Sequence, residues 1–265
     1  MSVVLDALSP QRRRLVLGAG GLILLLIMTV AVIAVVRVAA RSVDPVPQTA
    51  PGPVLLVPGY GGNVDSLQPL AAALRSAGRS VAIVEPLGDG TGDLRQQAEH
   101  LAEVAERVRD DAGAASVDVV GYSAGGVVAR LWVRGEGGAE MVRRVLTLGS
   151  PHHGTSQAAL GTEFAGGCPA ACEQLVPDSD LLRRLNAGDE TPAGPLWATV
   201  RSTSDQVVTP VDSAALSGAL NIVVQEVCPR SAVAHGDLSS DPVVLAALSS
   251  VLGVPAPQAP SDVAC

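Results

Sequence analysis

The sequence predicts an α/β domain built around a mainly parallel sheet. Short apolar, β-branched runs alternate along the chain with segments of helical periodicity. The runs are apolar at consecutive positions, which is typical of strands that are covered on both faces. Apolar residues make up 48% of the 265 residues, so the core of such a domain can be large.

Strands and helices follow one another in a regular order. The expected strands are residues 53–59, 80–86, 117–120, 142–151, 196–205 and 221–227. The expected helices are residues 66–78, 93–113, 124–134 and 241–253. In the second of these helices, apolar residues from Leu94 to Val108 recur at helical spacing and charges occupy the other face. Residues 152–195 show little periodicity, and a connection of this length is typical of a cap or binding loop.

An apolar segment near the N-terminus predicts a membrane anchor. Residues 15–36 contain no charge over 22 positions, and as a helix they would be roughly 33 Å long, close to the roughly 30 Å hydrocarbon core of a bilayer. Three arginines precede this segment, which predicts a cytoplasmic N-terminus and an exported remainder. We therefore expect a cytoplasmic end (1–14), a single-pass transmembrane signal anchor (15–37), a Pro-rich linker (38–52) and an extracellular catalytic domain (53–265) at the cell membrane. The alternative is a long signal peptide, whose cleavage would release a secreted protein.

The exported part is acidic. The segment up to Arg37 holds four arginines and one acidic residue, which leaves 14 arginines and 25 acidic residues, a net charge of −11, for the rest. This balance argues against nucleic acid as a partner. The chain has four cysteines, all on the exported side, where disulfides persist. The pairing Cys168–Cys172 with Cys228–Cys265 is preferred over the two other connectivities, and no metal site is expected.

Ser123 lies in the stretch GYSAG, which fits the pattern G-x-S-x-G between an expected strand and an expected helix. A chain that turns this sharply needs glycine two positions before and after the serine, because larger side chains there would collide with the strand and the helix. The turn would expose the serine hydroxyl at the N-terminus of a helix, where negative charge is favoured. We interpret Ser123 as a nucleophile rather than part of a simple turn.

A serine nucleophile needs a base and an orienting acid, in the chain order Ser, acid, His. His235 fits as the base, being the only histidine of the last 100 residues, whereas His152 and His153 are interpreted as structural or pocket-rim residues. Asp205, just past an expected strand, is the preferred acid, with Asp212 as its competitor.

An oxyanion hole is expected from two backbone amides. One is that of Ala124, directly after the nucleophile, and the other is that of Tyr60, in the Gly-rich loop VPGYGGN. The glycines of this loop would allow the backbone to approach a substrate closely.

The segments VPGYGG, GYSAGG, TLGSPHHGT, STSDQVVTP and HGDLSSDP, in this order, resemble the α/β-hydrolase lipases and esterases of actinobacteria. They are most similar to small triacylglycerol lipases of Streptomyces type, over residues 53–253. This resemblance implies an α/β-hydrolase fold, Ser123, Asp205 and His235 as the triad, and Tyr60 and Ala124 as oxyanion donors. Many members have His-Gly where this chain has Pro58-Gly59, and an N-terminal anchor is unusual among them.

We therefore expect a monomeric serine ester hydrolase that acts on acyl-lipid esters and needs no cofactor. Two alternatives stay open: an acyltransferase or thioesterase acting on envelope lipids, and an inactive, membrane-anchored binding protein on a hydrolase fold. The apolar residues of the insertion would form either an acyl-binding wall or lid, or ordinary core; they are Leu160, Phe164, Leu175, Leu181, Leu182 and Leu185.

Overall fold

The protein is described here from a computed structural model, which defines residues 11, 18–30, 43–158 and 168–265. The chain divides into two units, Met1–Val43 and Asp44–Cys265. In the first unit, residues 18–30 are helical. No helix within the described residues is long and apolar enough to cross a membrane. The expected anchor, 15–37, extends on both sides into residues outside this description.

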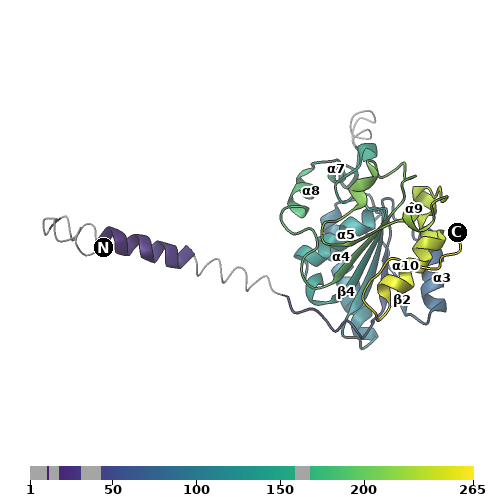
Figure 1. Ribbon diagram of the computed structural model, residues 1–265, viewed down its shortest axis with the longest axis horizontal. Helices are drawn as coiled ribbons and strands as arrows, with labels where there is room; N and C mark the ends of the chain where they lie inside the picture. The colour runs from purple at the N-terminus through teal and green to yellow at the C-terminus, as the bar shows by residue number, and fades with distance from the viewer. Residues whose placement is uncertain (1–10, 12–17, 31–42, 159–167) are drawn as a thin grey trace. The chain divides into compact units, whose positions relative to one another are not determined.

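The second unit is built on a sheet (Figure 1), which has six strands, all parallel, in the order β2-β1-β3-β4-β5-β6. The strands are β1 (Val54–Val57), β2 (Val81–Ile83), β3 (Val117–Tyr122), β4 (Val142–Leu148), β5 (Leu196–Arg201) and β6 (Leu220–Val223). The order reverses at β1, because the chain adds β2 on one side of it and all later strands on the other. Such a reversal opens a crevice at the carboxyl ends of the two strands beside it, here β1 and β3.

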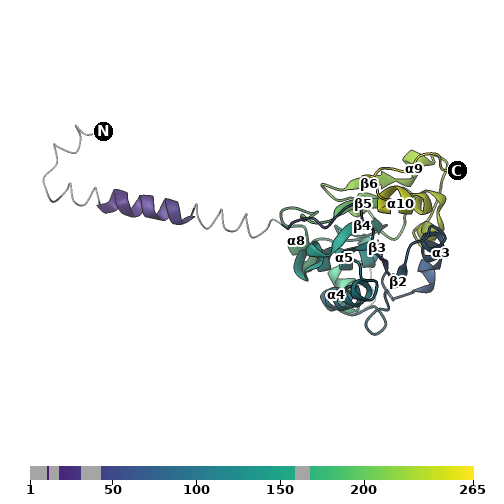
Figure 2. The same cartoon turned by 90° about the horizontal axis from the view of Figure 1, so that it is seen from below.

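Helices cover both faces of the sheet (Figure 2). The helices α4 (Leu94–Asp111) and α5 (Ala124–Gly135) pack on one face, and α3 (Gln68–Ser76) and α10 (Pro242–Leu252) pack on the other. Alternate residues of a strand serve the two cores: in β1, Leu55 packs with the first pair of helices and Leu56 with the second. The parallel sheet predicted from the apolar runs is therefore confirmed.

One expected strand is half wrong. The run 221–227 was expected to be extended throughout, but β6 ends at Val223 and a helical turn, α9 (Val224–Val227), follows. The N–H of Cys228 donates to the carbonyl of Val224 (2.8 Å), which closes this turn over the core. A short apolar run has no periodicity that would distinguish these two conformations.

The insertion 152–195 contains two short helices, α7 (Ala170–Gln174) and α8 (Asp180–Leu185). Disulfides join Cys168 to Cys172 and Cys228 to Cys265, which is the preferred pairing. Leu160 and Phe164 lie outside the described residues.

The second unit begins at Asp44, although residues 38–52 were expected to form a linker. Buried charges hold its first residues to the sheet. The guanidinium of Arg143 donates to the carbonyl of Gln48 (3.0 Å), and that of Arg79 donates to the carbonyl of Gly52 (2.8 Å). Both arginines bind Asp118, at the amino end of β3, so residues 44–52 are fastened to the sheet.

Candidate active site

A strained serine separates β3 from α5. Ser123 follows Tyr122, the last residue of β3, and precedes Ala124, the first of α5, with φ 51° and ψ −126°. A residue other than glycine in this region is strained and persists only when its surroundings hold it. Here the N–H of Ser123 donates to the carbonyl of Leu148 in β4 (2.8 Å), which fixes the turn to the neighbouring strand.

The glycines around Ser123 are required by close backbone contacts. A Cβ at Gly121 would lie 2.5 Å from the Cα of Gly126, and one at Gly125 would lie 2.3 Å from the carbonyl oxygen of Val57. Side chains at these positions would push β3, α5 and β1 apart. The G-x-S-x-G spacing is therefore a packing requirement of this junction.

Three side chains form one hydrogen-bonded row at the carboxyl end of the sheet. The hydroxyl of Ser123 lies 3.0 Å from Nε2 of His235, and Nδ1 of His235 lies 2.7 Å from Oδ2 of Asp205. A carboxylate accepts only, so Nδ1 carries the proton and Nε2 of the neutral ring accepts from Ser123. The structure thus brings together the three residues that were expected to form the triad.

Asp205 is held by the backbone that follows it. Its Oδ1 accepts from the N–H groups of Val207 (2.8 Å) and Val208 (2.9 Å), which leaves Oδ2 for His235. Burial by itself raises the pKa of this carboxyl. The hydrogen bond from His235, the charge of His235 and the two backbone N–H groups together lower the pKa by more than burial raises it, so the pKa lies below the ordinary value. Asp205 is consequently an anion that orients His235.

The competing residues lie elsewhere. Asp212 is 82% exposed and pairs with Arg201 (3.2 Å). His152 is fully buried, with Nε2 3.0 Å from Oγ1 of Thr147. His153 contacts Glu190 through Nε2 (2.7 Å). Asp212, His152 and His153 therefore each contact residues outside the row formed by Ser123, His235 and Asp205.

The expected oxyanion loop passes directly beside Ser123. A Cβ at Gly59 would lie 2.9 Å from the Cβ of Ser123, so glycine is needed for this approach. The loop is fixed by two backbone bonds, from Gly62 N–H to the carbonyl of Gly59 (3.1 Å) and from Gly61 N–H to the carbonyl of Gly90 (3.3 Å). Tyr60 follows Gly59 in this loop, and Ala124 begins α5, where the first N–H groups have no partner within the helix.

An apolar cavity of ≈ 250 Å³ opens at Ser123. Its walls come from the oxyanion loop, the segment after β4, α7 and the segment after Asp205; they are formed by Tyr60, Ser123, Pro151, Thr155, Gln157, Ala158, Cys172, Leu175, Val207 and Val208. The insertion leucines described, Leu175, Leu181, Leu182 and Leu185, are all buried in the core, and Leu175 also lines this cavity. Core packing therefore accounts for all four, and a role of Leu175 in acyl binding stays a prediction.

Thr155 joins three of the cavity walls. Its N–H donates to the carbonyl of Leu175 (2.9 Å), and its hydroxyl donates to the carbonyl of Val207 (2.5 Å) and accepts from the N–H of Thr209 (3.2 Å). These bonds connect the segment after β4 with the end of α7 and with the segment after Asp205.

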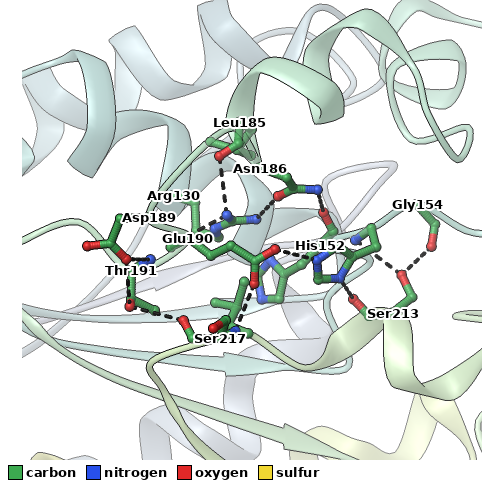
Figure 3. Close-up of polar contacts among 12 residues, drawn as sticks. Arg130, His152, Gly154, Leu185, Asn186, Asp189, Glu190, Thr191, Ser213 and Ser217 are labelled. Atoms are coloured by element: carbon green, nitrogen blue, oxygen red, sulfur yellow. Dashed lines mark hydrogen bonds and ion pairs between the residues drawn. The ribbon is translucent and has the colours of Figure 1, made fainter.

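Sequence reasoning missed a buried polar cluster that fastens the insertion (Figure 3). Arg130, on α5, donates to Oδ1 of Asn186 (2.9 Å) and to the carbonyl of Glu190 (3.1 Å). Asn186 in turn donates to the carbonyl of His152 (2.9 Å). Burial lowers the pKa of Arg130 to about 10 and holds that of His152 well below its ordinary value. The sequence signal was Arg130, which stands among apolar residues in a helix whose one other charged residue is Arg134. Among the described residues, no three His, Cys, Asp or Glu side chains lie in an arrangement that could hold a metal ion.

A parallel sheet of this order, with the serine turn after β3 and the acid and histidine on later loops, defines the α/β-hydrolase class. The chain belongs to the palmitoyl protein thioesterase family, whose profile matches residues 53–185. This match includes Ser123 but ends before Asp205 and His235, so the structure is what connects those two residues to the serine.

Solved structures support the fold. Lipase B of Aspergillus fumigatus is 20% identical with a TM-score of 0.68, over 82% of this chain and 56% of that lipase. The chain thus spans little more than half of that protein's length. The mature form of the Bacillus licheniformis lipase BlEst2 is 17% identical with a TM-score of 0.62, over 80% of this chain and 95% of that one.

Proposed function

We propose that this protein is a serine hydrolase that cleaves carboxylic acyl esters through an acyl-enzyme. The observation that supports this most directly is the row Ser123–His235–Asp205, with hydrogen bonds of 3.0 and 2.7 Å, at the mouth of an apolar cavity. Membership of a thioesterase family and the hydrolase fold agree with ester hydrolysis.

The reaction would proceed in two halves. Oγ of Ser123 attacks the acyl carbonyl while Nε2 of His235 takes its proton, and Asp205 stabilises the imidazolium. The negative oxygen that forms is held by the amides of Tyr60 and Ala124. His235 then protonates the leaving group, a water molecule attacks the acyl-enzyme with His235 again as base, and the acid is released.

The acyl group would occupy the cavity beside Ser123. The walls of this cavity are mostly apolar, which favours an apolar acyl chain over a polar acyl group. The Streptomyces-type lipase likeness, and with it triacylglycerol as substrate, is part of this proposal.

A thioester is the second candidate substrate, and the family match favours it. Both substrates pass through the same acyl-enzyme and differ only in the leaving group, a thiolate or an alkoxide. A matched pair, an oxygen ester and a thioester of the same acyl chain, distinguishes the two by kcat/KM. Added alcohols that divert the acyl group from the free acid would identify an acyltransferase.

The decisive experiment compares wild type with Ser123→Ala. We expect the variant to lose p-nitrophenyl ester turnover by at least about 10³-fold and to lose labelling by a fluorophosphonate. Ser250→Ala, which removes a buried serine hydroxyl on α10, is the matched control and keeps both. Turnover by Ser123→Ala near the wild-type level would disprove the nucleophile, and a folded wild-type protein that fails to label would favour the inactive binding protein.

We also propose that residues 15–37 anchor the chain as a single membrane span, with the catalytic domain outside the cell, and that the protein is monomeric. The uncharged run and the arginines before it support the span. Carbonate extraction and flotation of membranes from cells making the full chain test it. A chain recovered as a shortened, soluble protein in the medium would support cleavage instead.

A further inference from the structure

Tyr122 contacts the base of the proposed triad from the strand that carries the nucleophile. It is the last residue of β3, 8% exposed, and directly precedes Ser123. Its hydroxyl donates to the backbone carbonyl of His235 (2.9 Å), a bond between residues 113 positions apart. None of the triad interactions requires this bond, so it needs a separate explanation.

The ring of Tyr122 also faces the imidazole of His235. The two ring centroids lie 5.4 Å apart and the planes are inclined by 29°, a stacked arrangement. Stacked aromatic pairs favour one relative orientation. Tyr122 thus restrains His235 at two points, its backbone and its ring, while Asp205 restrains Nδ1.

The hydroxyl of Tyr122 remains a hydrogen-bond donor well above neutral pH. Burial, followed by the negative charges of Asp205 and Asp237, raises the pKa of Tyr122 to about 12. The phenol is therefore protonated at neutral pH, where its hydroxyl can donate to the carbonyl of His235.

We infer that Tyr122 is a positioning residue that sets the distance between the nucleophile and its base. The inference rests on the proposed function, because it assigns Tyr122 a role in proton transfer between Ser123 and His235. Two consecutive residues at the end of β3 fix both partners: Tyr122, the last residue of the strand, fixes the loop and the ring that carry Nε2, and Ser123, directly after it, carries Oγ. A displacement of His235 would consequently be opposed by the central strand of the sheet.

The test compares Tyr122→Phe and Tyr122→Leu with wild type at saturating ester. We expect Tyr122→Phe, which keeps the ring, to lower kcat about five- to tenfold, as for one lost buried hydrogen bond, with KM changed less than about twofold. Tyr122→Leu, which removes the ring as well, should lower kcat further. The rate of fluorophosphonate labelling should fall in parallel with kcat, because it depends on the same proton transfer.

Thr199→Val is the matched control. Thr199 is a fully buried residue of β5 whose hydroxyl donates to Asn221 (2.8 Å), without contact to the triad. Its replacement should lower Tm about as much as Tyr122→Phe and leave kcat unchanged. A proton NMR spectrum adds a signature independent of turnover: the downfield Nδ1–H resonance, identified by its loss in His235→Gln, should shift or broaden in Tyr122→Phe and persist in Thr199→Val.

Two outcomes would overturn the inference while the proposed function stands. In the first, wild type is active, the kcat of Tyr122→Phe per labelled site lies within about 1.5-fold of the wild-type value, and the His235 resonance is unchanged. The other is an equal loss of kcat in Thr199→Val, which would reduce the effect to general destabilisation. Failure of the proposed function is distinguishable, because then wild type and control would neither turn over ester nor label.

Discussion

Asp118 and Asp205 are buried carboxylates at opposite ends of the same parallel sheet. Asp118, at the amino end of β3, receives the Nε (2.9 Å) and a terminal nitrogen (2.5 Å) of Arg143 and a nitrogen of Arg79 (2.6 Å). Asp205, beyond the carboxyl end of β5, receives two backbone N–H groups and the imidazole of His235. One carboxylate is surrounded by permanent cations, the other by a partner that gains and loses a proton.

This difference separates a structural site from a chemical one. Arginine stays protonated, so the Asp118 cluster cannot exchange protons, and it ties Gln48, Gly52 and the end of α10 to the sheet. Histidine changes charge near neutral pH, and the Asp205 row ends on a strained serine at the crevice. The unfavourable backbone conformation of Ser123 is held by its own neighbours, among them the carbonyl of Leu148 that accepts from its N–H.

The largest expected effect separates the two carboxylates directly. Asp205→Asn should lower kcat by about 10³–10⁴-fold, because an amide no longer holds His235 in the tautomer that accepts from Ser123. The unfolding midpoint in urea should change little, since the amide oxygen still accepts from Val207 and Val208. A kcat within tenfold of wild type would remove Asp205 from the proposed triad.

Asp118→Asn should show the opposite pattern. It leaves two arginines, one of them fully buried, without their counter-charge, and we expect a loss of about 3–5 kcal/mol in unfolding free energy. Turnover per fluorophosphonate-labelled site should stay at the wild-type level under conditions where the variant is folded. Loss of turnover in folded Asp118→Asn would mean that the two ends are coupled.

Gly149→Ala tests how tightly the carboxyl end is packed. Gly149 has φ 53°, and a Cβ there would lie 3.1 Å from Nδ1 of His235, 3.2 Å from Oδ2 of Asp205 and 2.7 Å from Cδ1 of Leu238. We expect kcat to fall about tenfold or more as the imidazole is displaced, beside a backbone strain of about 1–2 kcal/mol.

Gly113→Ala is the matched control for this variant. Gly113 has nearly the same φ, 56°, with no atom within 4 Å of an added Cβ. It should carry the same strain and keep kcat. Equal kinetic losses in the two variants would refute the packing explanation.

The smallest effect concerns the pH dependence of stability. Burial lowers the pKa of His152 well below its ordinary value, so below about pH 6.5 the unfolded chain binds a proton at this residue that the folded chain does not. Stability should therefore fall with decreasing pH by up to about 1.4 kcal/mol per pH unit from this residue. Urea unfolding between pH 7 and pH 5 measures it, and His152→Asn should show a shallower slope; an unchanged slope would assign the effect to other groups.

The sequence alone determined the features that depend on neighbouring residues. The turn at Ser123 was predictable because G-x-S-x-G between an apolar strand and a helix is a local pattern, although the contact that requires Gly125, with Val57 of β1, is a tertiary one. The parallel sheet was predictable because the periodicity of apolar residues reflects which faces are buried. His235 was predictable because few histidines follow the serine. Its position in the chain did not, however, give its distance from Ser123 or the orientation of its ring.

Only the tertiary structure decided between candidate residues that are close in sequence, and only it showed the contacts between residues that are far apart in sequence. Asp205 and Asp212 are seven residues apart, and the choice depends on which one the end of β5 directs at His235 and which one reaches the solvent. The bonds of Asp118 to Arg79 and Arg143, and of Tyr122 to His235, join residues separated by 25 to 113 positions. Such contacts are set by strand register and by the order in which strands enter the sheet, and neither is encoded in a local pattern.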